Sequence, residues 1–434
     1  MRPKFFALTL ITSFSMHSVV SAADLLQVYQ LALVNDPIYT SARYALATGH
    51  EKEKQGLAVL LPTVGLGGTY ARSDKNYGSV NNSYSLQLTQ PLLRPGNWEI
   101  YQKGRLSLAA SEIEYAQAQQ DLMLRTSVAY FDVLGAQDAL SFLGAQKISI
   151  SEQRASAKRK FEIGASTITD VNEAQARYDL AITQEIAAQS DLDLALFKLQ
   201  RITGQSLIPL AVLRKDVKLS HPFPSQIDTW VASAQADNYA VMARQVKLKI
   251  AQSEIKHARA EYAPTVDLTA TRTYIDQANV HATGWQQRGY SNAVSVRWSI
   301  PLFSGLSTTS KVNEAVALAD KARSELEDAR RTAILNARQS FLGVTNGLMQ
   351  VKAFEAAELS SQFALDSCKL GYQFGVRINM DVLNAQQQLY SIRRDLARAR
   401  YDTLLNGLKL KAATGSLHED DLAQVNALLT ASAL

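Results

Sequence analysis

The chain has 434 residues, with 45 Lys and Arg against 40 Asp and Glu, so its formal net charge is only +5. This near-balance gives no indication of a nucleic-acid partner. The only cysteine is Cys368, which excludes an intrachain disulfide.

Residues 1–22 have the layout of a secretory signal peptide. Arg2 and Lys4 precede a short apolar run, and Val20-Ser21-Ala22 offers small residues for cleavage. A membrane anchor is the alternative, but the apolar run is too short to span a bilayer. The rest of the chain has no uninterrupted apolar run of about 18 residues. If the protein enters a membrane, we therefore expect strands to do so.

Residues 23 to about 56 predict helix with a break at Asn35-Asp36-Pro37, because proline is favoured at the start of a helix. Two alternating stretches follow, separated by a polar stretch at 72–82 that we expect to be an outer loop. In the first, one face holds Val64, Leu66, Gly68 and Tyr70, opposite Thr63, Gly65, Gly67 and Thr69; in the second, Tyr84, Leu86 and Leu88 oppose Ser83, Ser85, Gln87 and Thr89.

A proline-rich linker is expected at 206–226, then a modest helix from about Asp228 and a second pair of alternating stretches around a polar loop at 276–289. Their apolar faces hold Val266, Leu268 and Ala270, and then Val294, Val296, Trp298 and Ile300. One apolar face and one face of small polar residues is typical of transmembrane barrel strands. A half-buried soluble hairpin explains any one pair, but two such pairs with Tyr and Trp near their ends favour a barrel. Four strands cannot close a barrel, so we expect several chains to share the pore.

Long helices are predicted where proline is absent, at about 98–161, 169–202, 304–370 and 379–413. Some 60 helical residues would reach roughly 90 Å. Pro62, Pro91, Pro264 and Pro301 would mark the junctions between strands and helices. Val312, Ala319, Leu326 and Ala333 recur every seven residues, which indicates coiled-coil packing, either as a wall of helices or as an ordinary two-stranded coiled coil. After Gly415 we expect one short helix that begins with acidic residues.

The chain repeats itself. Gly164, Asp170 and Ala174 match Gly375, Asp381 and Ala385 at a constant offset of 211 residues (375 − 164). Each copy lies between two predicted long helices, so each is interpreted as the turn of a helical hairpin. We therefore divide the chain into a signal peptide at 1–22, a first repeat at 23–214 and a second repeat with linker and C-terminal segment at 215–434.

No catalytic or metal-binding constellation is visible among the six scattered histidines. Gly65-x-Gly67-Gly68 resembles part of a nucleotide loop, but small residues within an alternating strand explain it better. We predict no enzyme, no cofactor and no metal. Asp170 and Asp381 could simply start helices after Gly164 and Gly375, or could form carboxylate rings at a constriction if copies surround an axis.

Several motifs together resemble the TolC family of outer-membrane efflux and secretion proteins. They are Leu86-Gln87-Leu88-Thr89-Gln90-Pro91, Ala129-Tyr130-Phe131-Asp132, Ile168-Thr169-Asp170-Val171, Gln200-Arg201-Ile202-Thr203-Gly204, Pro264-Thr265-Val266-Asp267 and Asp381-Val382-Leu383-Asn384-Ala385. The resemblance implies an α+β membrane protein, a homotrimer whose 12-stranded transmembrane barrel, four strands per chain, continues as a long α-helical coiled-coil barrel across the periplasm. It also implies a partner periplasmic adaptor and an inner-membrane ABC or proton-driven pump, with type I protein secretion or multidrug efflux as the task.

The same resemblance assigns site residues. Asp381 and Asn384 would lie at the pore constriction, Tyr372 and Arg377 would link to Thr169 and Asp170 to hold the gate closed, and Gly164, Ala165, Gly375 and Val376 would form the tips that dock the adaptor. Where the pattern of the TolC family has a second aspartate, this chain has Asn384. We therefore expect one carboxylate ring, with Asn384→Asp strengthening cation selectivity and divalent block. The alternative is a secreted periplasmic coiled-coil adaptor that never inserts in the membrane.

Overall fold

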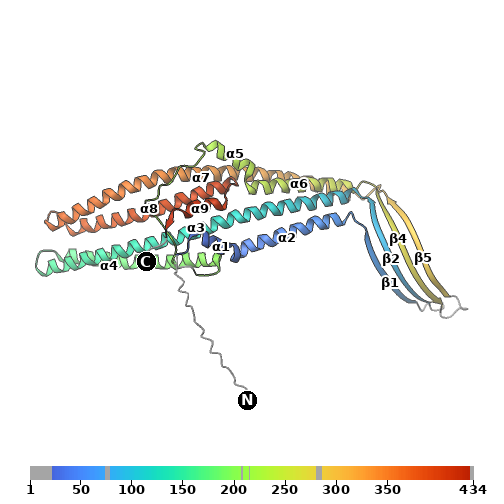
Figure 1. Ribbon diagram of the computed structural model, residues 1–434, viewed down its shortest axis with the longest axis horizontal. Helices are drawn as coiled ribbons and strands as arrows, with labels where there is room; N and C mark the ends of the chain where they lie inside the picture. The colour runs from blue at the N-terminus through green and yellow to red at the C-terminus, as the bar shows by residue number, and fades with distance from the viewer. Residues whose placement is uncertain (1–21, 74–78, 207–208, 215, 280–285, 431–434) are drawn as a thin grey trace, which may run out of the picture.

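The computed structural model describes residues 22–73, 79–206, 209–214, 216–279 and 286–430. The protein is elongated, with a sheet at one end and the turns of two helical hairpins at the other (Figure 1). The same order of elements occurs twice along the chain: helix, helix, strand, strand, long helix, shorter helix. The predicted signal peptide, except Ala22, lies outside the described residues.

The sheet is antiparallel in the order β1-β2-β4-β5, with β1 at Thr63–Ser73, β2 at Ser79–Leu93, β4 at Thr265–Asn279 and β5 at Gln286–Ser299. The four predicted strands are confirmed, but the predicted loops at 72–82 and 276–289 are wrong for most of their residues, which belong to strands. Only 74–78 and 280–285 between them fall outside the described residues. Polar residues on both faces there resemble a loop in sequence, although the backbone ladder continues.

The register gives the sheet two unlike faces, because residues paired across antiparallel strands lie on the same side. Val64 pairs with Leu88, Leu88 with Ala270, and Ala270 with Val294. The other face carries the matching row Gly65, Gln87, Thr271 and Ala293, with Thr, Ser and Asp in neighbouring rows. The predicted alternation is confirmed, and apolar side chains such as Leu66, Val294 and Trp298 are exposed on the single chain.

Four long helices form the two hairpins: α3 at Pro95–Glu162 with α4 at Ile168–Thr203, and α7 at Ser307–Gln373 with α8 at Asn379–Ala413. The 68 residues of α3 span about 100 Å at 1.5 Å per residue. Within the predicted heptads of α7, Ala319, Leu326 and Ala333 are buried, and Leu326 and Ala333 pack in one cluster with Val241 of α6. None of the helices in the described part of the chain is both long and apolar enough to cross a membrane.

Shorter helices brace the long ones. Helices α1 at Leu25–Asn35 and α2 at Pro37–Ala58 confirm the predicted break, and α9 at Glu419–Asn426 confirms the acidic short helix. The modest helix predicted from about Asp228 is confirmed as α5 at Ile227–Asp237, and α6 at Tyr239–Ala260 is a further helix that the sequence analysis did not separate from it. Asn238, whose side chain caps α6, makes this second break without a proline. The predicted linker also contains β3 at Val212–Leu213, which pairs with β6 at Leu429–Thr430.

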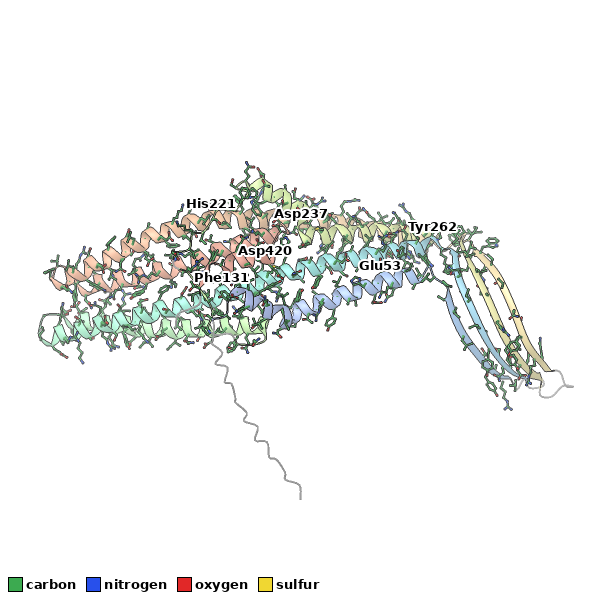
Figure 2. All side chains as sticks on the ribbon, in the orientation of Figure 1. Glu53, Phe131, His221, Asp237, Tyr262 and Asp420 are labelled. Atoms are coloured by element: carbon green, nitrogen blue, oxygen red, sulfur yellow. The ribbon has the colours of Figure 1, made fainter. Side chains whose placement is uncertain are left out.

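Pro91 lies inside β2 and not at a junction, so that prediction is corrected. The register shifts between Pro91 and Leu93, and a proline without an N–H group is tolerated at such an irregularity. Pro95 occupies the first turn of α3 instead. Tyr262 marks the passage from α6 to β4 at the sheet end of the helices (Figure 2).

The main hydrophobic core lies at mid-length, where α1 and α9 pack on α3, α4 and α8. Phe131 lies at its centre with Tyr29 and Tyr130, all almost fully buried (Figure 2). The Tyr130 hydroxyl donates to the Ala211 carbonyl at 2.6 Å, which satisfies its buried polar group. This core holds the two hairpins together at mid-length, and the hairpin turns lie far from it.

Candidate functional site at the hairpin turns

The two hairpin turns lie together at the end of the molecule farthest from the sheet (Figure 1). Gly164 follows α3 with φ of +72°, and Gly375 follows α7 with φ of +74°. Both adopt the left-handed conformation that suits glycine after a helix. The Ala165 N–H donates to the Lys160 carbonyl and the Val376 N–H to the Gly371 carbonyl, so both turns close in the same way. Their predicted role as helix ends is confirmed.

The first turn is well capped. Thr167, and not Asp170, is the N-cap of α4, while the Asp170 carboxylate accepts from the Ser166 hydroxyl at 2.8 Å and from the Thr167 N–H at 3.1 Å. The Ser166 hydrogen bond, and then the Thr167 N–H, hold the pKa of Asp170 below its usual value. Thr169, the other residue predicted on this side of the gate, is exposed.

The second turn is less completely satisfied. Ile378, the N-cap of α8, provides no side-chain hydrogen bond, and Asp381 in the first turn accepts from Arg377 at 3.5 Å. The buried Asn379 side-chain oxygen and the Tyr372 hydroxyl have no hydrogen-bond partner among the described residues. A buried polar group without a partner costs about 1–3 kcal/mol, so this turn is the one that a new contact would stabilise more.

Within one chain, the predicted gate residues do not meet in the predicted pairs. Arg377, in the second turn, pairs with Asp381 at the start of α8, and Asp170 is bound within its own turn. The Tyr372 ring instead lies 3.6 Å from the Lys160 ammonium of the first hairpin, a cation–π contact.

A second link between the hairpins comes from Arg177 of α4. Its guanidinium donates to the side-chain oxygens of Gln387 at 2.8 Å and Asn384 at 3.1 Å, both on α8. A small buried apolar cluster lies beside this contact and is formed by Ile150 of α3, Ala181 of α4 and Leu383 of α8. The hairpins of one chain therefore touch near their turns.

Lys160 and Arg177 are functional candidates that sequence reasoning missed. Neither belongs to a matched pair in the repeat, and each contact joins residues about 200 positions apart in sequence. Only the angle between the hairpins brings them together, and no local pattern encodes that angle.

The turns also expose apolar side chains. Ile163 and Val376 are each more than three-quarters exposed, and Phe374, Ile378 and Ile168 are exposed as well. These residues surround the predicted docking tips Gly164, Ala165, Gly375 and Val376. Exposed apolar residues gathered at one end of a molecule are typical of an interaction surface.

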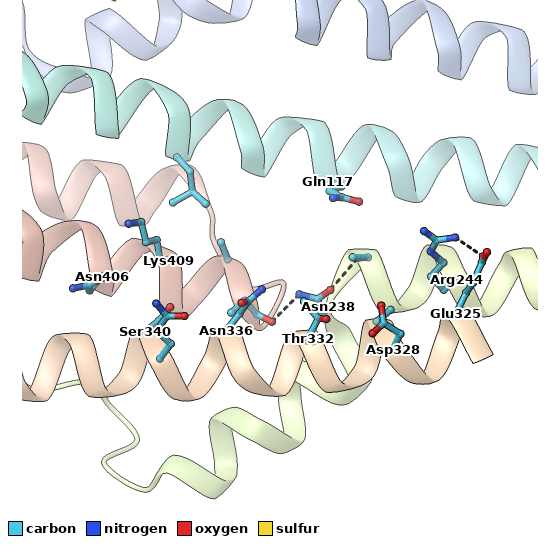
Figure 3. Close-up of a pocket in the computed structure, with 17 residues that line it drawn as sticks. Gln117, Asn238, Arg244, Glu325, Asp328, Thr332, Asn336, Ser340, Asn406 and Lys409 are labelled. Atoms are coloured by element: carbon cyan, nitrogen blue, oxygen red, sulfur yellow. Dashed lines mark hydrogen bonds and ion pairs between the residues drawn. The ribbon is translucent and has the colours of Figure 1, made fainter. Parts of the chain in front are cut away.

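Larger cavities lie elsewhere between the helices. Above the Arg177 contact, a cleft of about 960 Å³ separates α4 from α8 and is lined by Asp191, Arg394 and Arg398, among others. A cavity of about 660 Å³ lies between α3, α6, α7 and α8, with the Arg244–Glu325 ion pair on one side and Asn238 and Asn336 on its wall (Figure 3). Both are open, and polar and apolar atoms line them in similar measure, so neither resembles an enclosed pocket for a small apolar ligand.

Comparison with known proteins gives a consistent picture. The profile of the outer membrane efflux protein family matches residues 28–205 and 230–416. The outer membrane protein TolC of Escherichia coli is 32% identical over 427 residues, covering 95% of this chain and 86% of TolC. The alkaline protease secretion protein AprF of Pseudomonas aeruginosa is 31% identical over 423 residues, covering 94% and 87%.

Solved structures share the fold. The outer membrane protein VceC of Vibrio cholerae superposes with a TM-score of 0.78 at 18% identity, over 90% of this chain and 96% of VceC. The CmeC outer membrane channel of Campylobacter jejuni superposes with the same TM-score at 16% identity, over 99% of this chain and 98% of CmeC.

Proposed function

The chain belongs to the outer membrane efflux protein family and is an outer-membrane exit duct, and from this premise we propose that three copies form the duct and gate it at the hairpin turns. The task is type I protein secretion, multidrug efflux or both. A secreted adaptor that never meets the membrane is set aside, because this family resides in the outer membrane.

The observation that carries the proposal is the two-faced sheet with open edges. Strands β1 and β5 each pair on one side only within the described chain. One face presents exposed Leu66, Val294 and Trp298, and the other presents Ser, Thr and Gly. Four strands cannot surround a pore, whereas three copies give a closed barrel with apolar residues toward lipid and polar residues toward water.

The hairpins extend this pore into the periplasm. Exposed apolar residues recur every seven positions along α7, at Leu335, Leu342, Met349, Phe363 and Leu370, with Ala356 completing the series. A stripe of this period fits against a neighbouring helix in a coiled coil. In the trimer, α7 packs against the next chain and the helices form a continuous wall.

The gate lies at the turns. Asp381 and Asn384 form the constriction, and Tyr372 and Arg377 reach Thr169 and Asp170 of a neighbouring hairpin. Support comes from the second turn, where, within the described parts of the chain, the Tyr372 hydroxyl has no hydrogen-bond partner and the Arg377 guanidinium forms one exposed ion pair at 3.5 Å. An exposed ion pair stabilises a protein by about 0–1 kcal/mol. Three symmetric copies of such a pair therefore hold the gate closed only weakly, so the gate can open readily.

The tips at Gly164, Ala165, Gly375 and Val376 dock a periplasmic adaptor, which joins the duct to an inner-membrane pump. The exposed Ile163, Phe374 and Ile378 beside them support this assignment, since they offer apolar area to a partner. A partner bound at the tips is also best placed to move the hairpins apart.

Single-channel recording in planar bilayers tests the duct and its gate. We expect small, cation-selective openings for the purified protein, and larger, more frequent openings for Arg377→Ser. Arg398→Ser is the matched control, because it removes a second exposed i,i+4 arginine–aspartate pair, which lies within α8 and far from the turn. Openings that Arg377→Ser leaves unchanged would reject the gate, and absence of channels from folded protein would reject the duct.

A further inference from the structure

Arg177 makes the most extensive polar contact between the two hairpins near their turns. From α4 it reaches Gln387 at 2.8 Å, Asn384 at 3.1 Å and the Met380 sulfur at 3.9 Å. The three partners are spaced by four and three residues, so they form one stripe on α8. The planar guanidinium, with five N–H donors in a fixed fork, suits such a set of acceptors.

The position of Arg177 in the fold makes it a clamp. The apolar cluster of Ile150, Ala181 and Leu383 lies against the same junction, and beyond it α4 and α8 are separated by the cleft of about 960 Å³. Arg177 therefore lies where α4 and α8 come into contact between this cleft and the turns.

The charge of Arg177 is not neutralised by its partners. Asn384, Gln387 and Met380 are all uncharged, and no ion pair to Arg177 is found among the described residues. Asp381, on the adjacent side of α8, is paired with Arg377. Each chain thus brings an unpaired cation to within hydrogen-bond distance of Asn384.

We propose that Arg177 is a selectivity-determining residue of the duct, clamping the two hairpins of one chain and placing a ring of three positive charges beside Asn384. The inference rests on the proposed function, because the ring exists only if three chains meet at this level. A cationic ring there opposes the attraction of the Asp381 ring for cations. Asn384 and Arg177 act as one unit.

This unit changes what is expected of Asn384→Asp. The new carboxylate would lie beside the Arg177 guanidinium and form a charge-assisted hydrogen bond with it. Its charge would then be compensated, so the substitution alone should add little cation selectivity. The sequence-based expectation for Asn384→Asp is therefore revised to hold only when Arg177 is also removed.

Reversal potentials in a salt gradient across planar bilayers test the unit. Arg177→Gln should raise the cation-to-anion permeability ratio by about fivefold, the factor that corresponds to the roughly 1 kcal/mol between unit charges 4 Å apart in water. Asn384→Asp alone should change it little, and the double variant should exceed both. The differences should shrink in 1 M salt, where the Debye length falls to about 3 Å.

Arg154→Gln is the matched control. Arg154 of α3 donates to Gln175 and lies over the Tyr178 ring, all within the first hairpin, so it loses the same charge without touching the second hairpin. The proposal would be overturned if Arg154→Gln changed the permeability ratio as much as Arg177→Gln does. It would also be overturned if Asn384→Asp had the same effect with and without Arg177. Neither result would contradict the duct itself.

A second measurement needs no channel activity. In a Cys368→Ser background, Arg177→Cys with Asn384→Cys should be bridged within one chain by a bifunctional thiol reagent about as long as an arginine side chain. Gln175→Cys with Asn384→Cys is the control, because two helical positions turn residue 175 to another face of α4. The clamp would be rejected if the Arg177→Cys and Asn384→Cys pair were not bridged, or if the reagent joined two chains instead of two positions in one chain.

Discussion

Asp138 of α3 carries a half-buried carboxylate that accepts a hydrogen bond of 2.6 Å from the Tyr401 hydroxyl of α8. Burial raises the pKa of Asp138, and the Tyr401 hydrogen bond only partly opposes that rise. A carboxyl whose pKa is raised on folding favours the folded state at low pH. This contribution is lost as the pH rises through the raised pKa.

Replacing Asp138 should therefore stabilise the protein only where the carboxylate is charged. Asp138→Asn keeps an oxygen for Tyr401 and should raise the thermal unfolding midpoint at pH 8, by a free energy of order 1 kcal/mol, with little change at pH 4. Circular dichroism in detergent micelles gives the midpoints. Asp132→Asn, an exposed carboxylate on the same helix, is the control, and an equal loss of stability for Asp138→Asn at both pH values would refute the assignment.

Local residue patterns predicted part of the candidate site. Gly164 and Gly375 were predictable because only a left-handed residue closes these turns, and Asp170 because acidic residues favour the first turn of a helix. Arg177 and Lys160 were not, because their partners lie on another hairpin. The two turns also look alike in sequence, yet only the first has a capping box.

At the scale of elements, the helices were predicted closely and the strands only in part. A missing proline and a heptad repeat mark a helix along its whole length, as in α7 at Ser307–Gln373. A strand can be identified only where its two faces differ. At the ends of β2 and β4 farthest from the helices, polar residues such as the paired Asn82 and Asp276 occur on both faces. The alternation of apolar and polar residues therefore stops there, although the hydrogen-bonded pairing of the strands continues.

Close packing of α2 on α3 depends on glycine. A Cβ on Gly104 would lie 2.8 Å from the Lys52 carbonyl oxygen and 3.4 Å from the Gly56 Cα, both backbone atoms that cannot rotate away. The two helices can approach this closely only because both lack side chains at the crossing. This contact connects the mid-length core to the base of the sheet.

Gly104→Ala should therefore destabilise the protein by about 1–3 kcal/mol through overpacking. Gly144→Ala, on the same helix with no atom within 4 Å of its Cβ, should be neutral or stabilise by up to about 1 kcal/mol from helix propensity. Thermal unfolding of the two variants side by side separates packing from propensity. Equal midpoints would show that α2 does not need to lie so close to α3.

For the whole molecule, both the open sheet edges and the exposed heptads of α7 require copies of the same chain. The apolar face of the sheet needs lipid, and its edges need strands of another copy to complete their hydrogen bonds. In the proposed trimer, Asp381 and Arg177 would each form a ring of three residues. Stoichiometry is therefore the claim on which the pore, the gate and the charge of the constriction all depend.

The mass of the particle purified in detergent micelles tests this claim most directly. Native mass spectrometry strips the detergent and counts the chains. We predict a complex of three chains that needs detergent to stay in solution. A stable monomer soluble without detergent, or a complex that does not contain three copies, would contradict the account.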